Sequence, residues 1–289
     1  MSSKLFCFGL GFSAEALARR LKQQGWEIAG TVRSDQKADR LSALGYDVAT
    51  FEGPADKAEI AKRLEGTTHL LLSIPPRDGD PALILFRDAI AALKTLEWIG
   101  YLSTVGVYGD HDGAPVDEAT PPRPAKERSK ARLTAEADWL ALGEKTGVPT
   151  QVFRLAGIYG PGRSAIDKIN DGTAKRIVKP GQVFSRVHVE DIATVLEASI
   201  AQPRQGAIYN VADDEPAPPQ DVITYAAELL GVDPPPEVPF EQADMSPMAR
   251  SFYSERRHIL NDLIKSELKV ELAYPNYREG LRSLMPRQD

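Results

Sequence analysis

The chain has 289 residues, of which 42% are hydrophobic and 26% are charged, so it is long enough to bury a substantial core. Its formal net charge of −6 and its lack of any basic block argue against a nucleic-acid-binding protein. A single cysteine, Cys7, excludes a disulfide framework, and the apolar runs are too short to span a bilayer. Because the first predicted strand begins almost at the N-terminus, with no signal sequence before it, we expect a cytoplasmic protein.

The first half of the chain alternates short apolar runs with amphipathic stretches. Runs such as His69-Leu70-Leu71-Leu72 are continuously apolar, which is typical of strands in a parallel sheet covered on both faces. Strands are predicted at 4–8, 27–32, 47–50, 68–74, 97–102 and 150–155. Helices are predicted at 13–24, 36–44, 57–65, 81–95 and 125–142. This rhythm predicts an α/β fold with a doubly wound parallel sheet of the Rossmann type, and a ligand site at the carboxyl ends of its strands.

The second half has shorter, less regular elements, and proline and glycine cluster in it. Late strands are predicted at Val183–Val187 and Ala207–Val211, with an amphipathic helix between them. We interpret the remainder as a small C-terminal substrate lobe formed by segments that leave and re-enter the main sheet. The predicted NAD(P)-binding Rossmann domain comprises 1–157 and 183–212, and the predicted substrate-binding lobe comprises 158–182 and 213–289.

A glycine turn follows the first predicted strand and leads directly into the first predicted helix. Gly9 lets the chain turn tightly, and Gly11 has no Cβ, so the backbone can approach a phosphate closely. Ala14 replaces the third glycine of the dinucleotide fingerprint and still lets the helix pack on the strand. The helix would present its N-terminal N–H groups and positive dipole end to the anion. The turn therefore predicts a site for a dinucleotide pyrophosphate, although the same Gly-x-Gly-x-x-Ala pattern also occurs in ordinary strand–helix turns.

The end of the second predicted strand indicates which dinucleotide is preferred. NAD-specific Rossmann proteins usually have Asp or Glu here, where a carboxylate bonds the ribose hydroxyls. This chain has Arg33 and Ser34 instead, and a guanidinium and a hydroxyl can both bind a 2′-phosphate. We therefore expect NADP rather than NAD, with two alternatives open: Arg33 is simply solvated, or Asp35 supplies the carboxylate.

Other kinds of catalytic site find no support in the sequence. The four histidines are scattered, and none is spaced with another acid or cysteine like a zinc set, so no metal is implied. No serine lies in a Gly-x-Ser-x-Gly elbow, so a nucleophilic triad is also not implied.

Several later segments share one pattern with the glycine turn, and together they cover nearly the whole chain. Their order and spacing resemble the extended short-chain dehydrogenase/reductase superfamily, and within it the NAD-dependent epimerase/dehydratase group. The C-terminal segment resembles the ending of an atypical bacterial branch of that group. The segments are Ser103–Gly109, Ser129-Lys130, Arg154–Arg163, Val187–Ala193 and Tyr274–Leu281.

The resemblance implies a Ser/Thr, Tyr and Lys chemistry, in which the hydroxyl residue orients the substrate oxygen and the tyrosine is the acid/base. The lysine holds the nicotinamide ribose and lowers the tyrosine pKa through its charge. By position, Thr104 matches the hydroxyl residue and Lys130 matches the lysine. The tyrosine position holds Lys126, which departs from the family pattern and puts ordinary family catalysis in doubt.

Three explanations of this departure stay open. Lys126 can be an ordinary helix lysine in a protein that binds cofactor without turnover. Alternatively, Lys126 is itself the acid/base, since repulsion from Lys130 four residues later and from an oxidised nicotinamide would lower its pKa. In the third explanation, Tyr108 or Tyr159 supplies the phenol from a loop.

The resemblance also assigns a set of cofactor contacts. Ser73 to Pro75 are expected on the adenine and ribose side, with the alternative open that they form only a proline turn at the end of the strand. Gly157 and Ile158 are expected to approach the nicotinamide carboxamide through their backbone. The full expected set is Gly9, Gly11, Phe12, Ser13, Ala14, Arg33, Ser34, Ser73, Ile74, Pro75, Ser103, Lys130, Gly157 and Ile158.

The function implied is hydride transfer on a carbonyl, hydroxyl or sugar-nucleotide substrate; a non-catalytic NADP-binding redox sensor or scaffold is the alternative. The protein is expected to act on a small molecule and to be a homodimer, as many family members are. A sugar-nucleotide diphosphate would need basic groups in the small lobe. The candidates for these are Arg163, Lys168, Lys175, Arg176 and Arg250.

Overall fold

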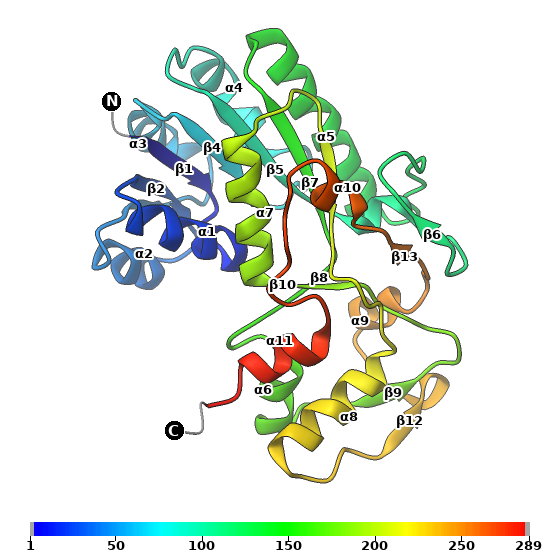
Figure 1. Ribbon diagram of the computed structural model, residues 1–289. Coiled ribbons are helices and arrows are strands. Elements are labelled where there is room, and N and C mark those ends of the chain that lie inside the picture. The colour runs from blue at the N-terminus through cyan, green and yellow to red at the C-terminus, as the bar shows by residue number, and fades with distance from the viewer. Residues whose placement is uncertain (1–2, 287–289) are drawn as a thin grey trace. The chain divides into compact units, whose positions relative to one another are not determined.

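The computed structural model describes residues 3–286, and its backbone divides into two compact units (Figure 1). The first unit comprises Met1–Val107, Pro124–Arg154 and Ile192–Tyr209, and the second comprises Tyr108–Arg123, Leu155–Asp191 and Asn210–Asp289. The predicted domain ends at residues 1 and 289 lie outside the described residues. Within residues 3–286, none of the helices combines the length and the apolar composition needed to cross a bilayer.

A seven-stranded sheet organises the first unit, in the order β11-β7-β5-β4-β1-β2-β3. The β1–β2, β2–β3, β1–β4 and β4–β5 pairs are all parallel. The strands are β1 Lys4–Phe8, β2 Glu27–Val32, β3 Asp47–Thr50, β4 His69–Leu72, β5 Trp98–Thr104, β7 Thr150–Leu155 and β11 Ile208–Val211. This order reverses direction between β1 and β4, which is the arrangement of a doubly wound Rossmann-type sheet. The predicted fold class is therefore confirmed.

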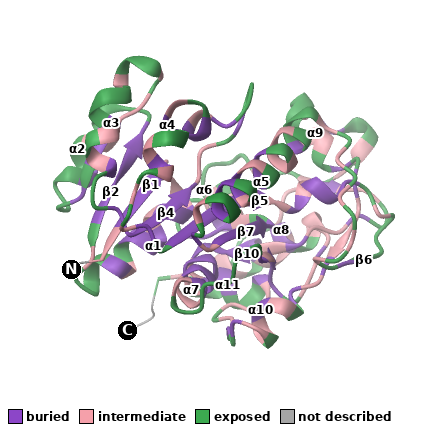
Figure 2. Cartoon of the chain, turned by 90° about the horizontal axis from the view of Figure 1, so that it is seen from above, coloured by how far each residue is buried: buried purple, intermediate pink, exposed green. Residues whose placement is uncertain are grey.

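Helices connect these strands, as parallel pairing requires. They are α1 Phe12–Gln23, α2 Asp35–Ser42, α3 Lys57–Leu64, α4 Pro81–Ala91, α5 Glu127–Thr146 and α7 Val189–Ala201, with 3₁₀ turns at Pro54–Asp56 and Val105–Tyr108. The strands are buried, whereas α2 and α3 expose their outer faces (Figure 2).

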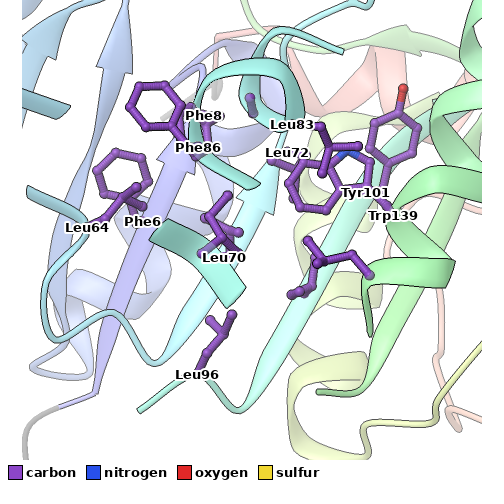
Figure 3. Packing of buried hydrophobic residues seen from close by; sticks show 14 of the residues in the cluster. Phe6, Phe8, Leu64, Leu70, Leu72, Leu83, Phe86, Leu96, Tyr101 and Trp139 are labelled. Carbon is purple, nitrogen blue, oxygen red and sulfur yellow. The ribbon is translucent and has the colours of Figure 1, made fainter. Parts of the chain in front are cut away.

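The core on one face of the sheet consists of side chains from the strands and from α3, α4 and α5 (Figure 3). Phe8 lies at its centre, with its ring centroid 5.0 Å from that of Phe6 and 5.2 Å from that of Phe86. Tyr101 and Trp139 extend the same core toward α5, and both are fully buried. Such burial of large apolar side chains is the main source of stability in this unit.

Helix α5 differs from its prediction at both ends. It begins at Glu127 rather than 125, because Lys126 has extended backbone (φ −97°, ψ 139°) and serves as the N-cap. It continues past the predicted end at 142, because Gly143 is a packing position and not a stop signal. A Cβ on Gly143 would lie 2.0 Å from Thr150 Oγ1 of β7, so only glycine lets the helix come this close to the strand. The helix ends at Gly147, which takes the left-handed conformation (φ 72°).

The second unit is built from short elements and two-stranded parallel pairs, β8–β10, β9–β12 and β6–β13. Its strands are β6 Pro115–Val116, β8 Gly157–Tyr159, β9 Arg176–Val178, β10 Arg186–His188, β12 Glu237–Pro239 and β13 His258–Ile259. Its helices are α6 Ala165–Asn170, α8 Pro219–Leu230, α9 Pro247–Phe252, α10 Asp262–Ser266 and α11 Tyr277–Ser283, with a 3₁₀ turn at Phe240–Gln242.

The strand predicted at Val183–Val187 is wrong in its bounds. Only Arg186–His188 forms a strand, because these residues pair with β8. Phe184 instead makes an isolated antiparallel bridge to Ala217. Residues 183–187 therefore contact two different segments, β8 and the region of Ala217, and the apolar pattern alone does not predict this division.

Candidate active site

The glycine turn at the end of β1 is held between β2 and β4. Gly9 has φ +88°, and a Cβ there would lie 2.8 Å from Ile74 Cγ2, so the position requires glycine. The Gly9 N–H donates to Thr31 Oγ1 at 2.9 Å, and the Leu10 N–H donates to the Thr31 carbonyl at 2.8 Å. On the other side, the Ser73 N–H donates to the Phe8 carbonyl at 2.9 Å. These bonds fix the path of the turn at the reversal point of the sheet.

Helix α1 begins at a glycine whose Cβ direction is unobstructed. Gly11 is its N-cap and provides no side-chain cap, and the first intrahelical bond runs from the Glu15 N–H to the Gly11 carbonyl. A Cβ on Gly11 would meet nothing closer than Ser73 Oγ at 3.9 Å. Ser13 and Ala14 are buried, and Phe12 is partly exposed. An uncapped helix N-terminus behind an unobstructed glycine is the arrangement that a pyrophosphate requires, so these residues fit a dinucleotide.

The residues after β2 differ in how they are engaged. Arg33 and Ser34 are exposed, and Arg33 makes no hydrogen bond or ion pair with any residue in 3–286. The Asp35 carboxylate accepts a hydrogen bond from the Thr50 hydroxyl at 2.6 Å. The Arg33 guanidinium is therefore unengaged within the described residues, whereas the Asp35 carboxylate is bonded to Thr50 of β3.

The residues after β4 border the glycine turn mainly through the apolar side chain of Ile74. Ile74 packs against the core of the first unit, and its Cγ2 is the atom that a side chain on Gly9 would strike. Ser73 is partly exposed and Pro75 is exposed. Ile74 therefore shapes the glycine turn, and Ser73 is the polar side chain nearest to Gly11.

Ser103 and Thr104 end β5 and serve different purposes. The Ser103 hydroxyl is buried and donates to Glu136 Oε1 at 2.5 Å, so it belongs to the interior. Thr104 is partly exposed, and its Oγ1 accepts a hydrogen bond from the Gly106 N–H at 3.1 Å.

A buried ion pair that the sequence analysis missed lies beneath this strand end. Glu136 of α5 and Arg154 of β7 are each 3% exposed at the side chain, and Arg154 Nη2 donates to Glu136 Oε2 at 2.7 Å. Arg154 Nε also donates to both carboxylate oxygens. Breaking such a pair leaves an uncompensated buried charge and typically costs about 3–5 kcal/mol. One signal was present: Arg154 is a lone charge within the otherwise uncharged strand Thr150–Leu155.

The two lysines assigned by resemblance lie at the start of α5. Lys130 is half-exposed and forms an ion pair with Glu127 at 2.7 Å. Lys126 is the N-cap, and its carbonyl accepts a hydrogen bond from the Lys130 N–H at 3.0 Å. The two lysines are therefore one turn apart, but the Lys126 side chain leaves an extended backbone and not the helix face that the repulsion argument assumes.

The remaining predicted site residues belong to the second unit. Tyr108 is fully buried, and its hydroxyl donates to Asn210 Oδ1 at 2.8 Å, so this phenol is engaged inside the second unit. Gly157 and Ile158 lie in β8, paired with Arg186 and Val187 of β10. Among the proposed diphosphate groups, Lys175 and Arg176 pair with Asp244 and Glu237 (3.4 and 2.6 Å), and Arg250 Nη2 donates to the Ala243 carbonyl at 2.7 Å.

The second unit also holds buried polar groups that lack ordinary partners. No described residue makes a hydrogen bond of standard geometry with the Tyr159 hydroxyl, His188 Nε2 or either carboxylate oxygen of Asp213. Burial raises the pKa of Asp213 to about 8, opposed by the charge of Arg186 and by the Glu215 backbone N–H. Burial also lowers the pKa of His188 to about 4 and raises the pKa of Tyr159. Nothing in the sequence marks Asp213, because its burial depends on segments far away in the chain.

Among the described residues, no group of three or more His, Cys, Asp or Glu side chains is arranged to hold a metal ion. The predicted residues that the structure brings together at the strand ends of the first unit are those of the glycine turn, the ends of β2, β4 and β5, and the start of α5.

Several known proteins are similar to this chain in sequence or in fold. A solved structure from Silicibacter pomeroyi DSS, described as a functionally unknown conserved protein, is 52% identical and has a TM-score of 0.89, covering 98% of both chains. Protein YeeZ from Escherichia coli K12 is 27% identical over 256 residues, which is 80% of this chain and 85% of YeeZ. The dTDP-glucose 4,6-dehydratase of Bacillus anthracis, solved in complex with NAD, shares the fold at 17% identity and a TM-score of 0.79, covering 98% of this chain and 95% of that one. The sequence model of the NAD dependent epimerase/dehydratase family matches residues 9–212, and this chain belongs to that family.

Proposed function

We propose that the chain binds NADP and transfers hydride to or from a carbonyl or hydroxyl carbon of a small molecule. The observation that carries this proposal is the glycine turn, where Gly11 leaves the uncapped first turn of α1 open to a pyrophosphate. A dehydratase of the same fold was solved with NAD, which supports a dinucleotide at this position. When bound, the cofactor supplies the hydride donor or acceptor.

The preference for NADP rests on the residues after β2. Arg33 is exposed and has no ion-pair or hydrogen-bond partner among the described residues, so its guanidinium can bind a 2′-phosphate with two parallel hydrogen bonds. Asp35, the residue that could favour NAD, has a carboxylate oxygen already engaged by Thr50.

Residues at the strand ends take the remaining roles in this proposal. Lys130 would hold the nicotinamide ribose, which requires it to exchange its exposed contact with Glu127. Such an exchange is inexpensive, because exposed ion pairs contribute only about 0–1 kcal/mol. Thr104 would orient the reacting oxygen of the substrate. A sugar nucleotide is one candidate substrate, although three of the basic groups suggested for its diphosphate already have partners within the second unit.

The first test is a calorimetric titration with NADP⁺, NADPH, NAD⁺ and NADH. We expect the two phosphorylated forms to bind more tightly, and Arg33→Ala to weaken them by about 10- to 100-fold, since a charged hydrogen bond is worth about 1.5–3 kcal/mol. Arg87→Ala, which removes the same charge from an exposed position on α4, is the matched control and should bind like the wild type. Equal weakening of NADPH and NADH in Arg33→Ala would contradict the NADP assignment. If none of the four nucleotides binds, the cofactor proposal fails.

A second candidate function is NADP binding without turnover, as in a redox sensor or scaffold. It is favoured by the lack of a phenol at position 126 and by the bond that holds Tyr108 to Asn210. Binding of only one redox form, with no hydride transfer to any carbonyl tested, would support it.

A further inference from the structure

Two hydroxyl groups in the first unit converge on one side of Gly106. A Cβ on Gly106 would lie 3.1 Å from Ser129 Oγ and 3.3 Å from Thr104 Oγ1. Both oxygens therefore border the volume that a side chain at position 106 would fill, and glycine keeps that volume open. The two hydroxyls come from different elements, since Thr104 ends β5 and Ser129 lies in the first turn of α5.

The protons of both hydroxyls remain available. Thr104 Oγ1 accepts from the Gly106 N–H, so its own O–H proton can be donated elsewhere. Ser129 is 3% exposed, yet its hydroxyl makes no hydrogen bond within residues 3–286. A serine inside a helix commonly donates to the carbonyl four residues earlier, which here would be that of Ala125. Because the Ser129 side chain packs inside the first unit and has no hydrogen-bond partner within residues 3–286, its hydroxyl can donate to a ligand.

The electrostatic surroundings favour negative charge on such a ligand. Helix α5 has 20 residues and no side-chain cap at its N-terminus, and the positive end of its dipole lies at the turn that holds Ser129, where Glu127 offsets part of the positive potential. Lys126 precedes the helix directly and adds a positive charge. Donors at a helix N-terminus stabilise an oxygen that becomes negative during a reaction.

We propose that Ser129 and Thr104 together donate to the reacting oxygen of a ketone or secondary alcohol, and that Ser129 takes over part of the role of the missing phenol. This inference rests on the proposed function. In the reducing direction, the carbonyl carbon accepts a hydride from the reduced nicotinamide and the C=O π pair moves to the oxygen. The two hydroxyls hold the resulting oxyanion, and a proton from water completes the alcohol. Oxidation follows the reverse order.

The experiment compares Ser129→Ala with Thr134→Ala, which removes an exposed hydroxyl from the same helix. NADPH binding is measured first by calorimetry, and then NADPH-dependent reduction of 9,10-phenanthrenequinone is followed by absorbance. We expect Ser129→Ala to lower kcat about 100-fold, the usual effect of removing one oxyanion donor, with an unchanged Kd for NADPH. Its melting temperature should stay close to that of the wild type, because the Ser129 hydroxyl has no hydrogen bond within residues 3–286 to lose. Thr134→Ala should keep wild-type kcat.

The outcomes separate the two proposals. If NADPH does not bind the wild type, the proposed function fails and this inference fails with it. If NADPH binds and Ser129→Ala keeps wild-type kcat, or if Ser129→Ala loses stability in step with activity, only the role of Ser129 is overturned. If NADPH binds but the quinone is not reduced, a crystal structure with NADP⁺ decides. A water or ligand oxygen bonded to both hydroxyls supports the role, and Ser129 Oγ donating to the Ala125 carbonyl overturns it.

Discussion

Asp213 is 1% exposed shortly after β11, and within the part of the chain that the structure describes neither of its carboxylate oxygens has a hydrogen bond of standard geometry. Arg186 lies close enough to lower its pKa, yet the Arg186 Nη1 donates to the carbonyls of Phe184 and Ala217 instead. Burial therefore dominates, and the pKa of Asp213 rises to about 8 from an ordinary value of 3.8. A group that is held so unfavourably reduces stability whenever it must ionise.

We predict that Asp213→Asn stabilises the protein at neutral pH. A raised folded-state pKa means that the wild type loses stability as pH rises above about 4 and continues to lose it up to about 8. At about 1.4 kcal/mol per pH unit, Asn should gain up to about 4 kcal/mol at pH 7 and almost nothing at pH 4. Urea unfolding followed by circular dichroism measures this difference. Asp233→Asn, an exposed position in the same unit, is the control. An equal gain at both pH values would mean that Asp213 does not titrate in this way.

Single residues also show why the candidate site was only partly predictable. The sequence predicts the glycine turn of Gly9 and Gly11 because a strand, a turn and a helix follow one another locally. It also predicts Lys126 inside the helix, since its neighbours are good helix formers, whereas in the structure Lys126 is the N-cap. The closeness of Ser129 to Thr104 cannot be predicted from the sequence, because the two residues meet only through the packing of α5 against the end of β5.

At the level of elements, prediction succeeded where periodicity is long and local. β1, β2, β3 and β7 have the predicted bounds, and their apolar runs are buried in a parallel sheet as expected. The sequence did not predict the paired short strands of the second unit, because two or three residues carry no usable period. The predicted end of α5 was wrong for a different reason, because a glycine within a helical pattern can mark either the end of the helix or a close packing contact.

The close contact of α5 with β7 gives a prediction for Gly143→Ala. Alanine within a helix normally stabilises by up to about 1 kcal/mol relative to glycine. Here the added Cβ would lie 2.0 Å from Thr150 Oγ1 and 2.8 Å from the Val148 carbonyl, so overpacking should outweigh that gain. We expect a net loss of about 1–3 kcal/mol in the free energy of unfolding, measured by urea denaturation. Thr134→Ala, at an exposed site of the same helix, should instead be neutral or slightly stabilising. If Gly143→Ala proves as stable as the wild type, α5 does not pack this closely on β7.

At the scale of the whole molecule, buried titratable groups change the free energy of unfolding in opposite directions as the pH rises. His69 in the first unit and His188 in the second have pKa values lowered by burial to about 4 from 6.5. Each histidine stays neutral in the folded state while the unfolded chain takes up a proton below pH 6.5, so both remove stability on acidification. Asp213 removes stability as the pH rises toward 8. Burial also raises the pKa of Asp80, so Asp80 acts in the same direction as Asp213. Between pH 5 and 6.5 the two histidines outweigh Asp213, and at pH values above 6.5 Asp213 dominates.

We therefore predict a maximum in the free energy of unfolding near pH 6.5. On the acid side, stability should fall by about 1.4 kcal/mol per pH unit, since two histidines oppose one aspartate. Circular dichroism at a series of pH values between 5 and 8 measures the profile. In His69→Gln the free energy of unfolding will change at every pH, because a buried group is replaced. The informative quantity is therefore its slope with pH, which should vanish between pH 5 and 6.5. Asp213→Asn should flatten the basic side and steepen the acid side. An unaltered acid slope in His69→Gln would mean that His69 is protonated in the folded protein, contrary to its burial between Trp26 and Trp98, with ring centroids at 4.6 and 6.2 Å.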